Sequence, residues 1–322
     1  MPGRDWNFKN DSAMSAKRIV IAGGSGFIGT ALALEFTERG DEVIVLTRRS
    51  RARRDDVREV VWDGEHPGDW TQFLDGADAV VNLTGRSINC RHTPENLRAI
   101  ITSRVNSVNA IAAAIGNVEK PPRAWVQASA TGIYGDTGNI ACDESAPAGN
   151  DALANICRQW EAACVAAHVP QTRRVTLRIG FVLGRAGGAL PVLSKLTKCF
   201  LGGTVGSGRQ YISWIHLADL VQMFVAAVEN EKLSGTFNAV APNAMTNAEF
   251  MRALRRRLDR PWSPPAPVFA VKIGSWLMGS EASLALVSQR CVPKKFQEAG
   301  FQFQFAELPP ALNDLCRCSS QN

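Results

Sequence analysis

The sequence predicts an α/β fold, in which a doubly wound parallel sheet carries helices on both faces and a smaller lobe follows toward the C-terminus. Two observations support this prediction. From Lys17 onward, short β-branched runs alternate with segments whose apolar residues recur every three or four positions, a pattern typical of parallel sheets flanked by helices. After Ile179 the alternation weakens and a glycine-rich stretch begins, which indicates that a second architecture follows.

The predicted elements follow in order along the chain. Strands are expected over Arg18 to Ala22, Glu42 to Thr47, Ala79 to Leu83, Ala124 to Ala128, Arg174 to Ile179 and Gly235 to Val240. Helices are expected over Ile28 to Arg39, Glu95 to Ile115, Asp151 to His168, Leu217 to Glu229 and Asn247 to Leu258. The chain beyond Pro242 is expected to form a lobe that closes over the carboxyl edge of the sheet.

The composition excludes several classes of protein. With 45% hydrophobic and 20% charged residues, the chain can bury an ordinary core. The excess of six positive charges is spread along the chain apart from the cluster Arg48 to Arg54, so no nucleic-acid partner is expected. The eight cysteines form no metal-ligand pattern, and no run approaches the ~20 apolar residues of a membrane span. Residues 1–16 lack the apolar core of a signal peptide. We therefore expect a disordered leader and a cytoplasmic protein without a membrane partner or a metal.

A dinucleotide-binding turn is predicted directly after the first strand, in the segment RIVIAGGSGFIG. Gly23 permits the tight turn, Gly26 lets a pyrophosphate approach the backbone, and Gly29 lets helix and strand pack closely. The pyrophosphate would lie on the N–H groups at the start of the helix, where the helix dipole favours negative charge. The candidate contacts of this turn are Gly23, Ser25, Gly26, Phe27, Ile28 and Gly29. The predicted fold is therefore of the Rossmann type.

The residues after the second strand predict which dinucleotide binds. An NAD-binding protein usually has Asp or Glu there for the ribose hydroxyls, whereas this chain has Thr47, Arg48 and Arg49. A guanidinium offers a planar fork to a 2′-phosphate, so NADP(H) is the expected cofactor. A solvated basic loop is the alternative, since the run of arginines continues to Arg54.

Further cofactor contacts are expected where later strands end. Asp63 follows the third hydrophobic run and would accept a hydrogen bond from the adenine amine. The segment NLTG ends the next strand, where a cofactor ribose would pass, and consists of Asn82, Leu83, Thr84 and Gly85. The chain thus divides into an NADP-binding domain, residues 17–180 and 208–240, and a substrate-binding lobe, residues 181–207 and 241–318.

At this point the chain resembles an extended short-chain dehydrogenase/reductase, and within that superfamily the atypical epimerase family with a C-terminal domain of unknown function. The motifs that carry the resemblance are NLTG at Asn82, SRV at Ser103, SATGIYGD at Ser129, WEAA at Trp160, LRIGFVLG at Leu177, GSGRQ at Gly206, WIH at Trp214 and NAVAPN at Asn238. The resemblance implies a Rossmann-type NADP(H) fold with reductase or epimerase ancestry, and it adds Arg104 to the cofactor site.

The sequence lacks the catalytic pair of ordinary members of this superfamily. They carry Tyr-x-x-x-Lys on one helix, because positions i and i+4 share a face and the ammonium lowers the pKa of the phenol. Neither of the two tyrosines here has Lys four residues later, and the helix reads NICRQWEAACVAA. Ile156 or Cys157 stands in place of the Tyr, and Trp160 or Glu161 stands in place of the Lys.

Four residues are candidates for catalysis. Tyr134 follows the fifth strand at the edge where such sheets bind ligands, and a packing role is the alternative. Glu161 could act as acid or base or form a structural ion pair. Ser129 and Thr131 could polarise a carbonyl or satisfy nearby backbone groups. Cys157 is more consistent with packing than with a nucleophile, because no base neighbours it in sequence.

Substrate contacts are expected from three further residues. Arg209 and Gln210 follow a flexible glycine loop and could bind an anionic or polyhydroxylated substrate. Arg178 ends a strand and could reach the cleft, or an acid could pair with it. The predicted function is an NADP(H)-dependent oxidoreductase or epimerase that acts on a small carbonyl or sugar-like substrate. The alternative is a redox sensor or regulator that binds the cofactor without turnover. A homodimer is compatible with either function.

Overall fold

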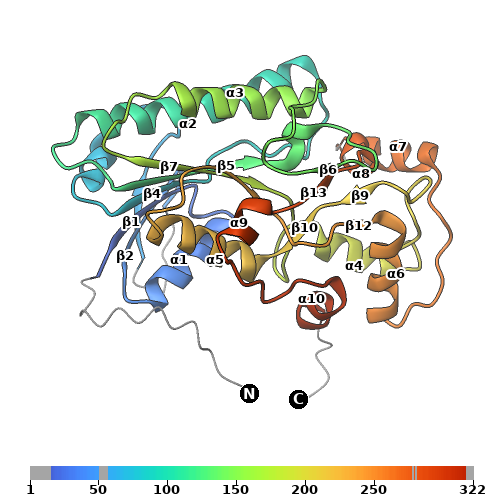
Figure 1. The fold of residues 1–322 in the computed structure, drawn as a ribbon. Helices are drawn as coiled ribbons and strands as arrows, with labels where there is room; N and C mark the ends of the chain where they lie inside the picture. The colour runs from blue at the N-terminus through green and yellow to red at the C-terminus, as the bar shows by residue number, and fades with distance from the viewer. Residues whose placement is uncertain (1–15, 51–56, 278, 280, 317–322) are drawn as a thin grey trace.

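Seven parallel strands form the central sheet, with helices on both faces (Figure 1). The structure, a computed structural model, describes residues 16–50, 57–277, 279 and 281–316. Residues 1–15 of the predicted leader, the basic run from 51 to 54 and the predicted end of the lobe at 317–318 lie outside these ranges. The strands are β1 (Arg18–Ala22), β2 (Glu42–Thr47), β3 (Arg58–Val61), β4 (Ala79–Asn82), β5 (Ala124–Ala130), β7 (Arg173–Ile179) and β11 (Gly235–Ala239). The predicted doubly wound α/β fold is confirmed.

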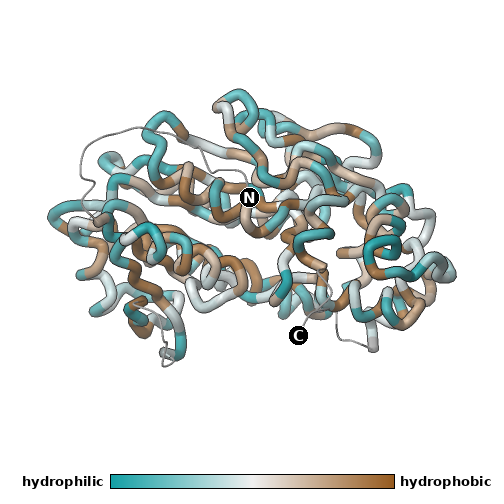
Figure 2. The backbone as a smooth tube through the Cα atoms, turned by 90° about the horizontal axis from the view of Figure 1, so that it is seen from below, coloured by the Kyte–Doolittle hydropathy of each residue, from teal (hydrophilic) through white to brown (hydrophobic). Residues whose placement is uncertain are grey.

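Two pairs of helices cover the sheet (Figure 1). Helices α1 (Phe27–Glu38) and α5 (Leu217–Glu229) pack together, as do α2 (Pro94–Asn117) and α3 (Ala152–Ala166) on the opposite face. Because side chains alternate along a strand, β1 contributes Ile19 and Ile21 to one core and Val20 and Ala22 to the other. Burial on both faces explains why these strands read as near-continuous apolar runs, which Figure 2 shows in brown inside the molecule.

The order of the strands reverses at β1. Across the sheet the order is β11-β7-β5-β4-β1-β2-β3, so the chain runs from β1 to β2 on one side and returns to β4 on the other. The carboxyl ends of β1 and β4 therefore flank the topological switch point, where sheets of this type bind ligands. The glycine turn follows β1, and the NLTG segment lies at the end of β4.

A smaller lobe packs beside the sheet. Its core lies between α4 (Leu190–Lys198), α6 (Asn247–Arg257) and α10 (Leu308–Leu315). Helix α4 was not predicted, because glycines on both sides of it indicated only loops. Three short ladders connect the lobe: β8 (Phe181–Leu183) with β10 (Trp214–His216), β9 (Tyr211–Ile212) with β12 (Met245–Thr246), and β6 (Ala141–Cys142) with β13 (Arg290–Cys291). In the ladder of β9 and β12, a strand of the predicted domain pairs with a strand of the predicted lobe. The boundary between domain and lobe stays a prediction.

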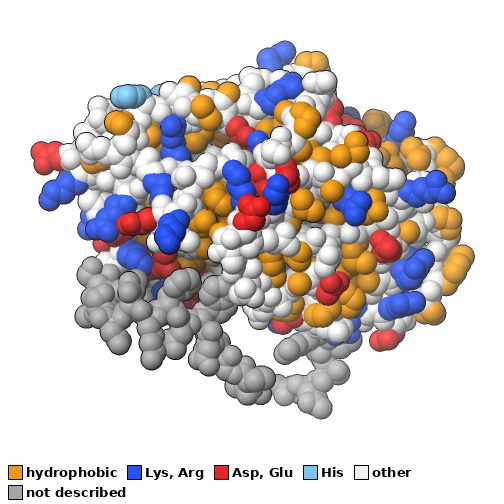
Figure 3. Space-filling model, viewed as in Figure 1, with side chains coloured by type: hydrophobic (Ala, Val, Ile, Leu, Met, Phe, Trp, Pro, Cys, Tyr) orange, Lys and Arg blue, Asp and Glu red, His pale blue; other side chains and the backbone are white. Residues whose placement is uncertain are grey.

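The surface of the lobe carries one exposed apolar helix. Helices α7 (Val268–Leu277) and α8 (Ser283–Leu286) lie beside each other on this side of the molecule (Figure 1). The short helix η2 (Thr131–Tyr134) follows β5, and α9 (Lys294–Glu298) packs against β11. On α7, Phe269, Ile273 and Trp276 are 67%, 56% and 61% exposed. Figure 3 shows hydrophobic side chains on this right-hand edge, interspersed with Lys and Arg. Within the described part of the chain, no helix is long and apolar enough to cross a membrane.

Candidate functional site

The glycine turn after β1 has the backbone geometry of a ligand cradle. Gly23 has φ of +77°, and a Cβ there would lie 3.0 Å from the carbonyl carbon of Leu83. A Cβ on Gly29 would lie 2.5 Å from the Cα of Gly24. Gly26 is different, since it is exposed and a Cβ there would meet only the Gly23 oxygen, at 3.3 Å. Two glycines therefore close the turn, and the third leaves one side open.

The first turn of α1 is prepared for an anion. Gly26 is the N-cap residue, no side chain caps the helix, and the first turn has no acidic residue. The first N–H groups of a helix have no partners within it, and the dipole makes this end positive. The ring of Phe27, the first residue of α1, packs closely on Gly184 and Gly187, because a Cβ on either glycine would lie 2.4 or 2.3 Å from it. This packing holds the start of the helix in place. This arrangement fits a pyrophosphate.

The NLTG segment lies against the same turn. Asn82 is buried; its Nδ2 donates to Ser107 and Gln127, and its Oδ1 accepts from the Thr84 N–H at 3.0 Å. The Thr84 hydroxyl is buried and has no hydrogen-bond partner in the described chain. A buried hydroxyl without a hydrogen-bond partner destabilises the fold, and a bound dinucleotide could supply the missing partner. The Thr84 hydroxyl is therefore a second observation that fits a dinucleotide at this turn.

The end of β2 is cationic and open. Thr47 is buried and its hydroxyl lies 3.0 Å from that of Ser25, which joins the glycine turn to β2. Arg48 and Arg49 are exposed. Asp63 is also exposed, and hydrogen bonds from the Glu65 N–H and from His66 lower its pKa to about 2. It is therefore a carboxylate acceptor at neutral pH, as the adenine prediction requires.

Four predicted residues meet in one buried network between β5, α3 and β7. The Ser129 hydroxyl donates to Glu161 at 2.6 Å, and Arg178 pairs with both Glu161 oxygens at 2.9 Å. Arg178 Nη1 also donates to the Tyr134 hydroxyl at 2.9 Å, and that hydroxyl donates to Asn238 at 2.7 Å. In the structure, Glu161 forms an ion pair with Arg178, as one of its two predicted alternatives has it. The same pair is the alternative predicted for Arg178, in which an acid partner keeps its side chain from reaching the cleft.

Tyr134 is enclosed by this network. Its side chain is only 4% exposed, and burial raises its pKa to about 12 against the opposing effect of Arg178. A phenol that already donates to Asn238 would have to break that bond to protonate a substrate. The contacts therefore favour the structural alternative for Tyr134 and Glu161, and their catalytic roles stay predictions.

The remaining predicted residues lie apart from this network. Thr131 is buried and donates to Gln289 at 3.0 Å. Gln210 is buried too, and its Nε2 donates to the Val205 and Ala285 carbonyls, so it braces the lobe. Arg209 is exposed. Their predicted catalytic and substrate roles stay untested.

Helix α3 presents Leu153 and Cys157 to the loop after β5, one turn before Glu161. A Cβ on Gly132 would lie 3.6 Å from the Leu153 Cβ and 3.8 Å from the Cys157 sulfur, so these two residues, one turn apart, face the loop after β5. Trp160 lies in the core and Glu161 in the ion pair. Burial raises the pKa of Cys157 to about 12, with Glu161 adding to the effect, so the thiol stays protonated.

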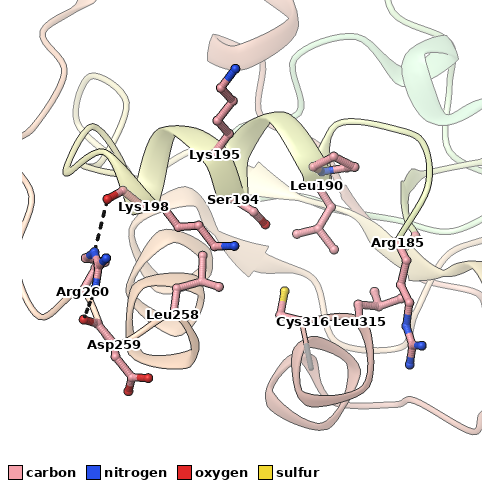
Figure 4. Close-up of a pocket in the computed structure, with 12 residues that line it drawn as sticks. Arg185, Leu190, Ser194, Lys195, Lys198, Leu258, Asp259, Arg260, Leu315 and Cys316 are labelled. Atoms are coloured by element: carbon pink, nitrogen blue, oxygen red, sulfur yellow. Dashed lines mark hydrogen bonds between the residues drawn. The ribbon is translucent and has the colours of Figure 1, made fainter. Parts of the chain in front are cut away.

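Two cavities lie on the side of the lobe. The larger, about 780 Å³, lies between α4, the end of α6 and α10; Figure 4 shows Ser194, Lys198 and Leu258 pointing into it. The smaller, about 590 Å³, is lined by Arg91, Asp136 and Lys272 among others. It borders the loops that follow β4 and η2, so it is the cavity at the carboxyl edge of the sheet.

The comparisons with known proteins agree with this geometry. A model described as the NAD dependent epimerase/dehydratase family matches residues 19–239, and one described as a domain of unknown function (DUF1731) matches residues 266–315. The chain belongs to the NAD-dependent epimerase/dehydratase family. The resemblance drawn from the sequence motifs is thereby confirmed, including the C-terminal domain.

Family members with similar sequences and structures cover nearly the whole chain. The epimerase family protein SDR39U1 of Bos taurus is 36% identical over 306 residues, 92% of this chain and 99% of its own length. Its chloroplastic homologue in Arabidopsis thaliana is 35% identical over 305 residues, 92% of this chain and 86% of its own. The crystal structure of human SDR39U1 with NADPH has a TM-score of 0.83 at 32% identity, covering 92% and 98%. Because one relative is chloroplastic, a cytoplasmic location stays a prediction.

Proposed function

We propose that this epimerase-family chain binds NADPH across the switch point of the sheet. The open side of Gly26, at an uncapped helix N-terminus without acidic residues, is the observation that carries the proposal. The first turn of α1 would hold the pyrophosphate through its N–H groups. Thr84, whose hydroxyl has no hydrogen-bond partner among the described residues, would face the cofactor from the NLTG segment. The NADPH in the human SDR39U1 structure supports the same cofactor here.

Arg48 and Arg49 would select the phosphorylated cofactor. Both are exposed at the end of β2, where a 2′-phosphate would lie beside them. An acidic residue at this position would instead accept hydrogen bonds from the ribose hydroxyls and repel a phosphate. We expect NADPH to bind at least tenfold more tightly than NADH, a difference of about 1.4 kcal/mol.

The proposed activity is that of an oxidoreductase or epimerase on a small carbonyl or sugar-like substrate. Bound NADPH would supply the hydride. The cavity of about 590 Å³ beside the loops after β4 and η2 supports a small substrate, with Arg91 and Lys272 as cations on its wall. Tyr134 and Glu161 stay the proposed proton-transfer groups, and Ser129 and Thr131 stay the proposed groups that polarise a carbonyl, although each already has a partner. A homodimer also stays a prediction.

Titration of the full chain with NADPH and with NADH tests the cofactor assignment. Arg48→Asp should weaken NADPH binding about tenfold and leave NADH binding nearly unchanged. Lys120→Asp is a matched control, because it makes the same change in charge at the opposite, amino-terminal edge of the sheet, before β5. Equal affinities of the parent for the two cofactors would reject the assignment.

A panel of carbonyl compounds tests the activity. Turnover is followed by the loss of nicotinamide absorbance when NADPH is oxidised. A chain that binds NADPH tightly and oxidises it with none of the aldehydes, ketones and keto sugars in the panel would count against the enzyme and favour the regulator.

A further inference from the structure

The cavity of about 780 Å³ lies apart from the residues predicted to bind cofactor or substrate. It is lined by α4, the end of α6, the end of α10 and the loop at Gly184 and Arg185. None of the residues that line it belongs to the glycine turn, the NLTG segment, the end of β2 or the predicted substrate contacts. Cavities that hold small molecules have volumes of about 300–1,000 Å³. This cavity is therefore large enough for a ligand of its own.

The floor of the cavity is apolar. Leu190 begins α4 and Leu258 follows α6; both line the cavity, and they are only 2% and 9% exposed. Both also belong to the core cluster of the lobe, and Leu315 at the end of α10 lines the cavity beside them. An apolar group bound here would move from water onto leucine side chains, which is favourable by about 25 cal/mol for each Å² buried.

One wall of the cavity carries a cation without an acidic partner. Ser194 and Lys198, one turn apart on α4, point into the space beside Leu258 (Figure 4). Neither side chain has a hydrogen bond or an ion pair to the described residues. The acidic residue of the lining, Asp259, points away from them in the same view. An ammonium group beside a hydroxyl can bind an anionic oxygen through two donors.

Two arginines at the edge of the cavity use their charges differently. Arg185 pairs with Asp314, with its Nη2 3.1 Å from the Oδ1 of that residue. Arg260 instead donates to two carbonyl oxygens, of Lys198 at 3.2 Å and of Asp259 at 3.1 Å, and within the described residues it forms no ion pair. Arg260 therefore adds a second uncompensated positive charge on the side of the cavity that carries Lys198.

We propose that this cavity is a second ligand site, which binds an amphiphilic anion. The apolar chain of the ligand lies on the leucines, and its carboxylate or phosphate accepts from the Lys198 ammonium and the Ser194 hydroxyl. A neutral apolar ligand leaves the ammonium without a partner, and a small anion without a chain leaves the leucine floor in water. Both parts of the ligand are therefore needed for tight binding.

Calorimetric titration of the full chain with octanoate tests the two parts of the ligand. Octanoate should bind at least about tenfold more tightly than octanol, which has the chain without the charge, and than acetate, which has the charge without the chain. Octyl phosphate identifies the head group, because the tighter of the two anions carries the one that fits. Equal affinities for octanoate and octanol, or binding of neither octanoate nor octyl phosphate, would overturn the proposal.

The same titration at saturating NADPH shows whether the site is separate from the cofactor site. Because no lining residue is shared, NADPH should change the octanoate affinity by less than about twofold. An octanoate affinity that falls in proportion to the NADPH concentration would place the anion in the cofactor site instead and would refute a second site. A chain that binds octanoate and no NADPH would contradict the proposed function alone.

Two lysines of α4 provide matched variants. Lys198→Met keeps an apolar stem and removes the ammonium, so octanoate binding should weaken about tenfold while octanol binding stays the same. Lys195→Met makes the same change of charge in the last turn of the same helix, but the Lys195 side chain points away from the cavity (Figure 4). It should change the octanoate affinity by less than about twofold. Because both variants lose a cation that favours the helix C-terminus, equal losses of octanoate affinity would show an unspecific attraction and would reject the site.

A third variant tests the place of binding without removing a charge. Ser194→Leu puts a larger side chain into the space between α4 and Leu258, and leucine suits a helix better than serine does. The variant should therefore fold like the parent and bind neither octanoate nor octyl phosphate. If Ser194→Leu binds octanoate with the affinity of the parent, the anion binds elsewhere and the proposal is wrong.

Discussion

Alanine substitutions at Gly26 and Gly29 should separate ligand binding from folding within a single turn. At Gly26, a Cβ meets one backbone oxygen at 3.3 Å, and φ of −80° suits any residue. The remaining cost is that of Ala at an N-cap, below about 1 kcal/mol. The methyl group would occupy the side from which the pyrophosphate approaches. Gly26→Ala should therefore leave the free energy of unfolding nearly unchanged and weaken NADPH binding at least tenfold, or about 1.4 kcal/mol.

At Gly29 the added methyl group meets backbone instead. Three backbone atoms of Gly23 and Gly24 lie within 2.5 to 2.8 Å of the Cβ position, and none can rotate away as a side chain would. Overpacking of this kind costs about 1–3 kcal/mol, so Gly29→Ala should unfold at lower urea concentration even without ligand. Urea unfolding and NADPH fluorescence titration of both variants provide the comparison. The reasoning fails if Gly26→Ala binds NADPH like the parent, or if it loses as much stability as Gly29→Ala.

Three further predictions concern the buried network and the Cys157 thiol. Tyr134→Phe removes the donor to the Asn238 Oδ1 and one acceptor of Arg178 Nη1. It should lower stability by about 1–3 kcal/mol, whereas a catalytic Tyr134 would show a loss of turnover of about a hundredfold. Glu161→Gln breaks a buried ion pair and should cost about 3 kcal/mol in urea unfolding; an unchanged midpoint would contradict the pairing. Burial raises the pKa of Cys157 to about 12, above roughly 8.5 in the unfolded chain. The contribution of the protonated thiol to stability is therefore complete below about pH 8.5 and is lost as the pH rises through about 12. The loss in the free energy of unfolding should reach about 2 kcal/mol at pH 10. Cys157→Ala should remove this part of the fall in the free energy of unfolding, while burial of Cys164 and Cys291, which raises their pKa values to about 11 and about 12, maintains the rest.

The sheet was predictable from sequence because its signals are local. The ends of each predicted strand and helix agree with the structure to within two residues. The spacing of apolar residues and the positions of the glycines are enough to place these ends. Helix α4 was missed for the same reason, because the glycines beside it indicate loops. The ladder of β6 with β13 joins segments about 150 residues apart, and no local pattern specifies such a pairing.

The glycine turn was predictable as a site, but the catalytic region was not. Gly23, Gly26 and Gly29 need only their own strand and helix to define their roles. Tyr134 looked available because it follows a strand at the ligand-binding edge. Its burial depends on Arg178 and Asn238, which are 44 and 104 residues away in sequence. A motif shows which residues are present, and only the tertiary contacts show which of them are already occupied.

The same contacts change where chemistry is to be sought. Tyr134, Glu161 and Arg178 satisfy one another, so using any of them for proton transfer would require breaking a buried bond, which costs about 1–3 kcal/mol. Cys157 offers a protonated thiol whose pKa of about 12 is far from the range of an efficient acid or base. Among the described residues, Arg104 on α2 keeps Nε and Nη2 without hydrogen bonds, and its guanidinium lies against Gly85 at the end of the NLTG segment. A guanidinium stays charged at neutral pH and stabilises an anionic oxygen without giving up a proton. If none of these contacts opens during turnover, a chain that oxidises NADPH in this site should show a rate that is nearly independent of pH between about 6 and 9, because Tyr134 and Cys157, with pKa values of about 12, do not titrate in that range. A bell-shaped profile in that range would instead point to a titrating side chain and would require one of the buried contacts to open during turnover.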